Sequence, residues 1–290
     1  MVKSNKYEIY KKMFNLCSDI IEDSSDKNLV SKKIKLEQLF YNLKVVEEDN
    51  SQSEILFRSI VYEIRLYDYI KRLGFNIIAS NDNKAGPDFH IPDVCYTEAV
   101  LASTGKEDII DISNLKGISA TTFDDPKWGV SRLTYSFIEK SNKYREYIKK
   151  GILNETPKVI AIDGSILAYK TFKSILNEKM KQVLYGIGPI QYTFMDNNLF
   201  VNRQFISSVS KINSLSQIEL AYFMSPLYNH ISAVILNYNY FSDNFMEDII
   251  IYINPNAIEK LNKENFINKI KCYDIVDFDE KSNTYKFNIL

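Results

Sequence analysis

Two acidic residues lie in short runs that are otherwise typical of buried strands, Asp88 in residues 87–91 (PDFHI) and Glu98 in residues 94–100 (VCYTEAV). A three-residue loop at 92–94 would pair Ile91 with Cys95 and place Asp88 opposite Glu98, whereas a two-residue turn would separate them. Two carboxylates at such a short distance repel each other unless a cation lies between them. Since Mg²⁺ prefers carboxylate and water oxygens, this stretch predicts a metal site. Alternatively, Asp88 caps the preceding turn and Glu98 pairs with a nearby lysine.

Two further charged residues are expected to point inward from helices. At 100° per residue, Glu63 falls inside the apolar arc of a helix expected over residues 53–73. Lys140 falls inside the apolar arc of a second helix, expected over residues 132–150, and Lys143 lies at its edge. An inward lysine near an acidic pair could offset charge on a phosphate. The alternative is that Lys140 lays its stem on the core and extends its ammonium group to water.

The elements that must position these residues alternate between helical and strand patterns, which predicts an α/β fold with a sheet of mixed direction. Helices are expected over 4–24, 27–48 and 166–184, in addition to the two above, with a junction at 49–53. Strands are expected over 75–79, 159–162, 190–195, 199–206, 231–236, 249–253, 273–278 and 285–289, besides the two acidic runs. We divide the chain into an N-terminal helical region (1–50), a core (51–165) and a C-terminal α/β extension packed on the core (166–290).

Composition is that of an ordinary globular protein, with 290 residues, 45% of them hydrophobic and 25% charged. No apolar run approaches the roughly 18 residues that a membrane span requires, and the first residues lack a secretory signal, so we expect a cytoplasmic protein. The net charge of -1 argues against a general polyanion binder. Residues 140–181 nevertheless contain ten Lys or Arg against four Asp or Glu, which indicates either a local basic surface or simply solvated helix faces.

The order of these features resembles the PD-(D/E)XK nuclease superfamily over about residues 55–165. An inward Glu on a helix comes first, then a strand with Gly86-Pro87-Asp88-Phe89, then a strand with Glu98. The resemblance implies a restriction-endonuclease-like mixed sheet flanked by helices. It also implies that Asp88 and Glu98 hold one or two Mg²⁺ or Mn²⁺ ions, with the help of Glu63.

The chain departs from the superfamily pattern at one position, because the motif lysine should lie two residues after Glu98, where Val100 stands. A basic residue from a neighbouring element can replace this lysine in some members, and Lys140 is the first candidate. Lys143, Arg132 and Lys106 are the other candidates and could bind substrate. Several segments are also similar to uncharacterised bacterial members of the superfamily, namely Glu98-Ala99-Val100, the helix with Lys140, and residues 159–163, 231–234 and 254–257.

These observations predict a metal-dependent nuclease that hydrolyses phosphodiester bonds of DNA or RNA, acting alone, as a homodimer or with a partner protein. One alternative is a catalytically inactive nucleic-acid-binding or protein-interaction module, and another is a hydrolase of other phosphoesters. Nucleophilic-triad chemistry has little support, because His90 and His230 are the only histidines and the chain has no Gly-x-Ser-x-Gly motif.

Overall fold

The computed structural model describes residues 2–45, 51–80, 85–102, 126–165, 167, 173–195, 198–210, 216–238, 249–266, 269–279 and 284–289. Its helices are α1 (Val2–Glu22), α2 (Lys27–Val45), α3 (Ser51–Arg72), α4 (Pro126–Lys149) and α6 (Lys173–Tyr185). Short 3-10 helices are η3 (Tyr222–Met224), η4 (Pro226–Tyr228) and η6 (Lys263–Asn265).

An eight-stranded sheet in the order β1-β2-β3-β4-β9-β10-β11-β12 forms the centre of the fold. Its strands are β1 (Ile78–Ala79), β2 (Phe89–Ile91), β3 (Cys95–Leu101), β4 (Lys158–Asp163), β9 (Ala233–Asn237), β10 (Ile249–Ile253), β11 (Lys271–Asp279) and β12 (Thr284–Ile289). Two smaller antiparallel pairs join β5 (Ile187–Met195) to β6 (Asn198–Phe205) and β7 (Ser208–Ser210) to β8 (Gln217–Glu219). The large sheet has mixed direction, because β3, β4 and β9 are parallel whereas β1, β2 and β3 are antiparallel. The predicted α/β class with a mixed sheet is therefore confirmed.

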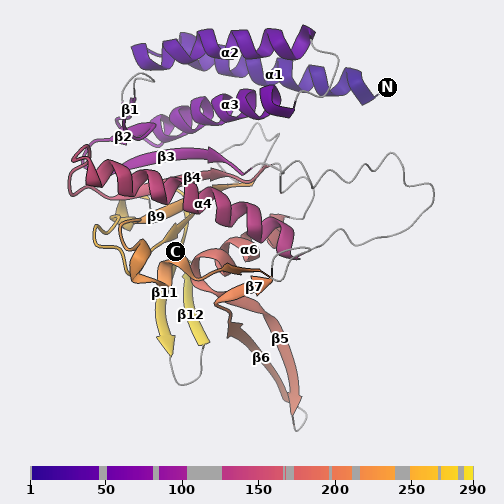
Figure 1. Cartoon of the computed structure of the whole chain (residues 1–290), viewed down its shortest axis with the longest axis vertical. Helices are drawn as coiled ribbons and strands as arrows, with labels where there is room; N and C mark the ends of the chain where they lie inside the picture. The colour runs from indigo at the N-terminus through magenta and orange to yellow at the C-terminus, as the bar shows by residue number, and fades with distance from the viewer. Residues whose placement is uncertain are drawn as a thin grey trace.

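Helices cover both faces of this sheet and make a three-layer arrangement (Figure 1). Helices α1, α2 and α3 share one apolar core with alternate residues of the central strands, among them Ala99, Val159 and Ile235. Helices α4 and α6 share a second core with the intervening residues, such as Ile160 and Val234. Because successive side chains of a strand point to opposite faces, a sheet buried on both faces needs continuous apolar strands. The fully buried strands β4, β9 and β10 have this pattern.

The β2–β3 hairpin has the three-residue loop that brings the two acids together. Ile91 pairs with Cys95 and Phe89 with Thr97. The Val94 amide donates to the Ile91 carbonyl at 3.0 Å, and Asp93 has a φ of 61°. A positive φ at the third position of a turn after proline is typical of type II, and aspartate tolerates it better than most residues. Continued by one residue beyond the last pair, this register sets Asp88 opposite Glu98.

Several element boundaries differ from the sequence-based expectation, most of the strand boundaries by only one to three residues. Helix α4 begins at Pro126 rather than near Arg132, since a proline in the first turn lacks only an amide that the helix would leave unused. Residues 51–53, expected to be a junction, belong to α3. Of the strand expected over 75–79, only Ile78 and Ala79 pair with β2. The Phe75 ring instead packs on the Phe266 ring, with ring centroids 5.1 Å apart. None of the described helices has the length and apolar character needed to cross a membrane.

Tyr144 on α4 connects this helix to the sheet and provides a test of the packing. Its fully buried hydroxyl lies 3.0 Å from the Tyr96 carbonyl and 2.8 Å from the Val159 carbonyl. Tyr144→Phe should lower the free energy of unfolding by about 1–2 kcal/mol, because buried carbonyls lose their donor. Urea denaturation would measure the loss. Tyr135→Phe on the exposed side of α4 is the control and should leave stability unchanged.

His230 should make stability depend on pH. Burial, with a smaller contribution from Arg145, lowers the pKa of His230 from 6.5 to about 4, and its Nε2 lies 3.0 Å from the Ser141 hydroxyl. Because the unfolded chain takes up this proton near pH 6.5 and the folded chain only near pH 4, stability from the neutral imidazole is lost as the pH falls across this window. His230→Asn should therefore flatten the pH dependence of the urea midpoint between pH 7 and 4. An equally steep dependence in the variant would contradict this assignment.

Candidate functional site

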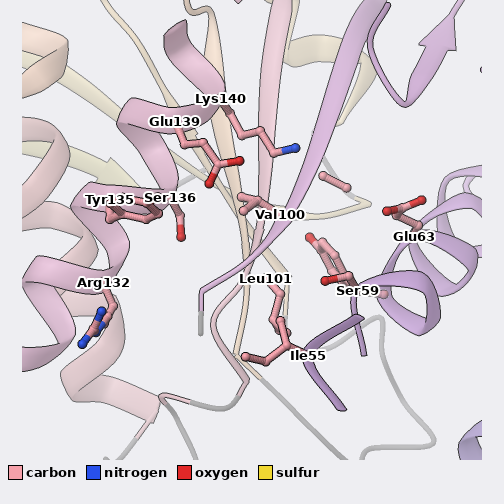
Figure 2. A pocket seen from close by; sticks show the side chains of 12 residues that line it. Ile55, Ser59, Glu63, Val100, Leu101, Arg132, Tyr135, Ser136, Glu139 and Lys140 are labelled. Atoms are coloured by element: carbon pink, nitrogen blue, oxygen red, sulfur yellow. The ribbon is translucent and has the colours of Figure 1, made fainter. Parts of the chain in front are cut away.

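The candidate site lies at the carboxyl half of β3, between α3 and α4. Within the described part of the chain, β2 pairs with β3 only as far as Thr97, so the edge of β3 from Glu98 to Leu101 extends beyond β2. A pocket opens there, with walls from α3, β3 and α4. Figure 2 shows Lys140 and Glu139 on α4 facing Glu63 on α3, with Val100 between them. The pocket is lined by Ile55, Ser59, Tyr62, Glu63, Ala99, Val100, Leu101, Arg132, Tyr135, Ser136, Glu139 and Lys140.

Glu98 is the most deeply buried acid of the site, with a side chain that is 0% exposed. Its Oε2 accepts a hydrogen bond from the Lys140 ammonium at 2.9 Å, and its Oε1 accepts one from the Tyr147 hydroxyl at 3.0 Å. The Lys143 ammonium lies 3.6 Å from the same Oε2. Helical spacing predicted that Lys140 points inward, and this is confirmed, since its side chain is 8% exposed and forms an ion pair rather than extending to water.

Neighbouring charges oppose the effect of burial on this pair. Burial and the Asp88 carboxylate raise the pKa of Glu98, whereas the two lysine ammonium groups lower it. Burial alone would lower the pKa of Lys140, but the carboxylates of Glu98 and Asp88 outweigh burial and raise it. Lys140 therefore keeps its positive charge throughout the neutral pH range.

Asp88 is fixed against the backbone of β3. Its Oδ2 accepts a hydrogen bond from the Ala99 amide at 2.7 Å, and its own carbonyl accepts one from the Ser80 amide at 2.9 Å. The side chain therefore caps the strand edge beside Glu98. His90, two residues further on, stacks on Tyr96 with ring centroids 4.5 Å apart, which accounts for its position without a role in the site.

Glu63 reaches the pocket from α3 with a side chain that is 18% exposed. Burial and the Asp88 carboxylate raise its pKa, and Lys32 acts in the opposite direction. The Lys32 ammonium donates to Glu63 Oε2 at 2.6 Å. Lys32 was not predicted as a site residue, although its spacing contains a signal. It lies three residues after Leu29 and four before Leu36, both fully buried, so it shares their face of α2.

The remaining basic candidates have different positions. The Lys143 side chain is 43% exposed at the edge of the site, and Arg132 lines the pocket about two turns of α4 before Lys140. A second hollow along α4, lined by Tyr135, Ile138, Glu139, Asn142, Lys143 and Glu146, adjoins the first through Tyr135 and Glu139. Lys106 lies outside the described residues.

The acids of the site fit a hard divalent cation by their chemistry. Among the described residues, no group of three or more His, Cys, Asp or Glu side chains is placed so that it could hold a metal ion. Mg²⁺ does not need such a group, because it commonly binds one or two carboxylates and keeps waters or substrate phosphate as its other ligands. Asp88 and Glu98, which are not among the residues that line the pocket, would supply two carboxylates, and Glu63 on α3 would add negative charge.

Removing one partner of the buried ion pair should destabilise the fold far more than removing the exposed lysine. Lys140→Met leaves the Glu98 charge buried and should lower the free energy of unfolding by about 3 kcal/mol or more. Lys143→Met should cost about 1 kcal/mol or less, because this side chain is partly solvated. Chemical denaturation of both variants, and of Lys140→Met combined with Glu98→Gln, would measure this. The double variant should recover much of the stability that Lys140→Met loses. If Lys140→Met and Lys143→Met lower the free energy of unfolding equally, the assignment of Lys140 as the buried partner is contradicted.

Comparison with known proteins adds no relative from which a role could be transferred. No protein-family model, curated protein or solved structure matches this chain significantly. Any function must therefore be inferred from the residues and geometry of the site itself.

Proposed function

We propose that this protein is a nuclease that uses Mg²⁺ or Mn²⁺ to hydrolyse phosphodiester bonds of DNA or RNA, on a restriction-endonuclease-like core. The observation that carries the proposal is the Lys140 ammonium, 2.9 Å from Glu98 Oε2, next to Asp88, whose side chain accepts a hydrogen bond from the amide of Ala99. Lys140 supplies from α4 the positive charge that the superfamily motif places where Val100 stands. In this proposal Asp88 and Glu98 take the place of the two motif carboxylates, and Lys140 takes the place of the motif lysine from a different element.

The chemistry of phosphodiester hydrolysis explains why these residue types belong together. The reaction needs an activated water, neutralisation of charge that develops on the phosphate, and protonation of the leaving oxygen. A divalent ion, when bound, would supply Lewis acidity and lower the pKa of a bound water. Asp88 and Glu98 would hold that ion.

The lysines and the arginine would act on the substrate. Lys140 would offset charge on the scissile phosphate, because its ammonium remains charged and is held in place by Glu98. Lys143 and Arg132 lie on the same helix at the pocket and its edge, where they could attract the neighbouring phosphates of the backbone.

A binding module without catalytic activity is the second candidate. This candidate is favoured because both carboxylate oxygens of Glu98 already have partners, namely Lys140, Lys143 and Tyr147. A carboxylate so engaged can serve as a structural anchor for α4 while the surface beside it binds nucleic acid or another protein.

The nuclease proposal predicts that Asp88→Asn lowers the cleavage rate at least about 100-fold without loss of fold. Asparagine retains an oxygen that can accept the Ala99 amide, but it loses the charge needed for a cation. Plasmid DNA, single-stranded DNA and structured RNA would be incubated with the wild-type protein and the variant in Mg²⁺, Mn²⁺ or excess EDTA. EDTA should abolish cleavage.

Asp93→Asn is a matched control, because Asp93 is an exposed aspartate in the β2–β3 loop and asparagine also tolerates its positive φ. This variant should cleave at the wild-type rate. If the wild-type protein cuts no substrate with either metal but retains nucleic acid in a binding assay, the binding module replaces the nuclease.

A further inference from the structure

Helix α2 carries a buried lysine whose charged group meets the candidate site. Lys32 is 5% exposed and is flanked on its face of the helix by Leu29 and Leu36, both fully buried. Its ammonium donates to Glu63 Oε2 at 2.6 Å. Burying a lysine is unfavourable unless it is paired, so the contact with Glu63 is central to its placement.

The helical hairpin of α1 and α2 is held next to the site by a second, independent set of contacts. Asp26 accepts a hydrogen bond from the Ala79 amide at 3.1 Å, and the Asn28 side chain donates to the Ala79 carbonyl at 2.7 Å. The next residue, Ser80, donates its amide to the Asp88 carbonyl at 2.9 Å. The start of α2 therefore binds Ala79, and the residue after Ala79 binds the backbone of Asp88.

The hairpin also shares the apolar core of α3. Cys17 and Ile21 of α1 and Leu29 of α2 are buried in the same cluster as Phe57 and Ile64 of α3. In Figure 1 α3 lies between the hairpin of α1 and α2 and the strand β3. Lys32 consequently approaches Glu63 from a rigid element rather than from a loop.

We propose that Lys32 is a positioning residue that holds the Glu63 carboxylate at the wall of the pocket, so that the N-terminal hairpin completes the cation site of Asp88 and Glu98. This inference deepens the proposed function and rests on it for the identity of the cation. Without Lys32, repulsion from Asp88 would act on a carboxylate with no ammonium group to anchor it. Residues outside the metal ligands often control affinity in this way.

Mn²⁺ binding to the full-length protein, measured by calorimetry without substrate, tests the inference separately from cleavage. Lys32→Met should weaken Mn²⁺ binding about 10- to 100-fold. Lys32→Arg, which keeps the charge, should retain most of the affinity. Lys33→Met is the matched control: Lys33 is the next residue of α2 and forms a 2.7 Å ion pair with Glu22, away from the pocket, so the affinity should stay at the wild-type value.

A double variant separates positioning from a general loss of structure. In a Glu63→Gln background, Lys32→Met should cause no further loss of Mn²⁺ affinity, because Lys32 acts only through the Glu63 carboxylate. Circular dichroism would confirm that each variant is folded. If Lys32→Met does not fold, Lys32→Gln, which can still donate a hydrogen bond to Glu63, should show the same direction of change.

The outcomes distinguish this inference from the proposed function. A wild-type protein that binds Mn²⁺ and loses affinity on Lys32→Met supports the inference, even if it cleaves no substrate and the nuclease proposal fails. A folded Lys32→Met protein with wild-type affinity overturns the inference while leaving the nuclease proposal intact. A wild-type protein that binds no Mn²⁺ overturns the inference together with the metal dependence of the proposed function.

Discussion

The buried ion pair between Glu98 and Lys140 is the interaction on which the arrangement of this site depends. A fully buried carboxylate is costly unless its charge is matched, and the matching charge comes from a helix 42 residues further along the chain. The pair fixes the rotation of α4 about its axis, because only one face of the helix can point Lys140 at β3. Tyr144 and Tyr147 follow on the same face and bond to the sheet and to Glu98.

A second buried pair, Lys32 with Glu63, repeats this solution on the opposite wall of the pocket. Both pairs join a helix to an acid of the site, and Asp88 lies between them on the hairpin. The pocket is thus formed where two helical layers meet an edge of the central sheet beyond the short strand β2. Because β2 ends before the end of β3, polar residues along the edge of β3 can reach solvent while both apolar cores stay buried.

Much of the fold could be predicted from periodicity, because its helices and buried strands are long and strongly patterned. Alternation along residues 95–101 separates Ala99, which faces α3, from Glu98, which faces α4, and the spacing of α4 turns Lys140 inward. Short or irregular segments were less predictable. The pairing of residues 75–79 depends on the partner strand and on Phe266, 191 positions after Phe75, and no local pattern contains that information.

The sequence by itself determined which side chains are acidic or basic and which face of each helix or strand they occupy, since both follow from residue type and local period. Only the tertiary structure decided which of these faces meet. It selected the hairpin register that sets Asp88 opposite Glu98, chose Lys140 over Lys143 as the close partner of Glu98, and brought Lys32 to Glu63. Such pairings depend on how layers pack across long stretches of chain, so residues distant in sequence carry no local sign of them.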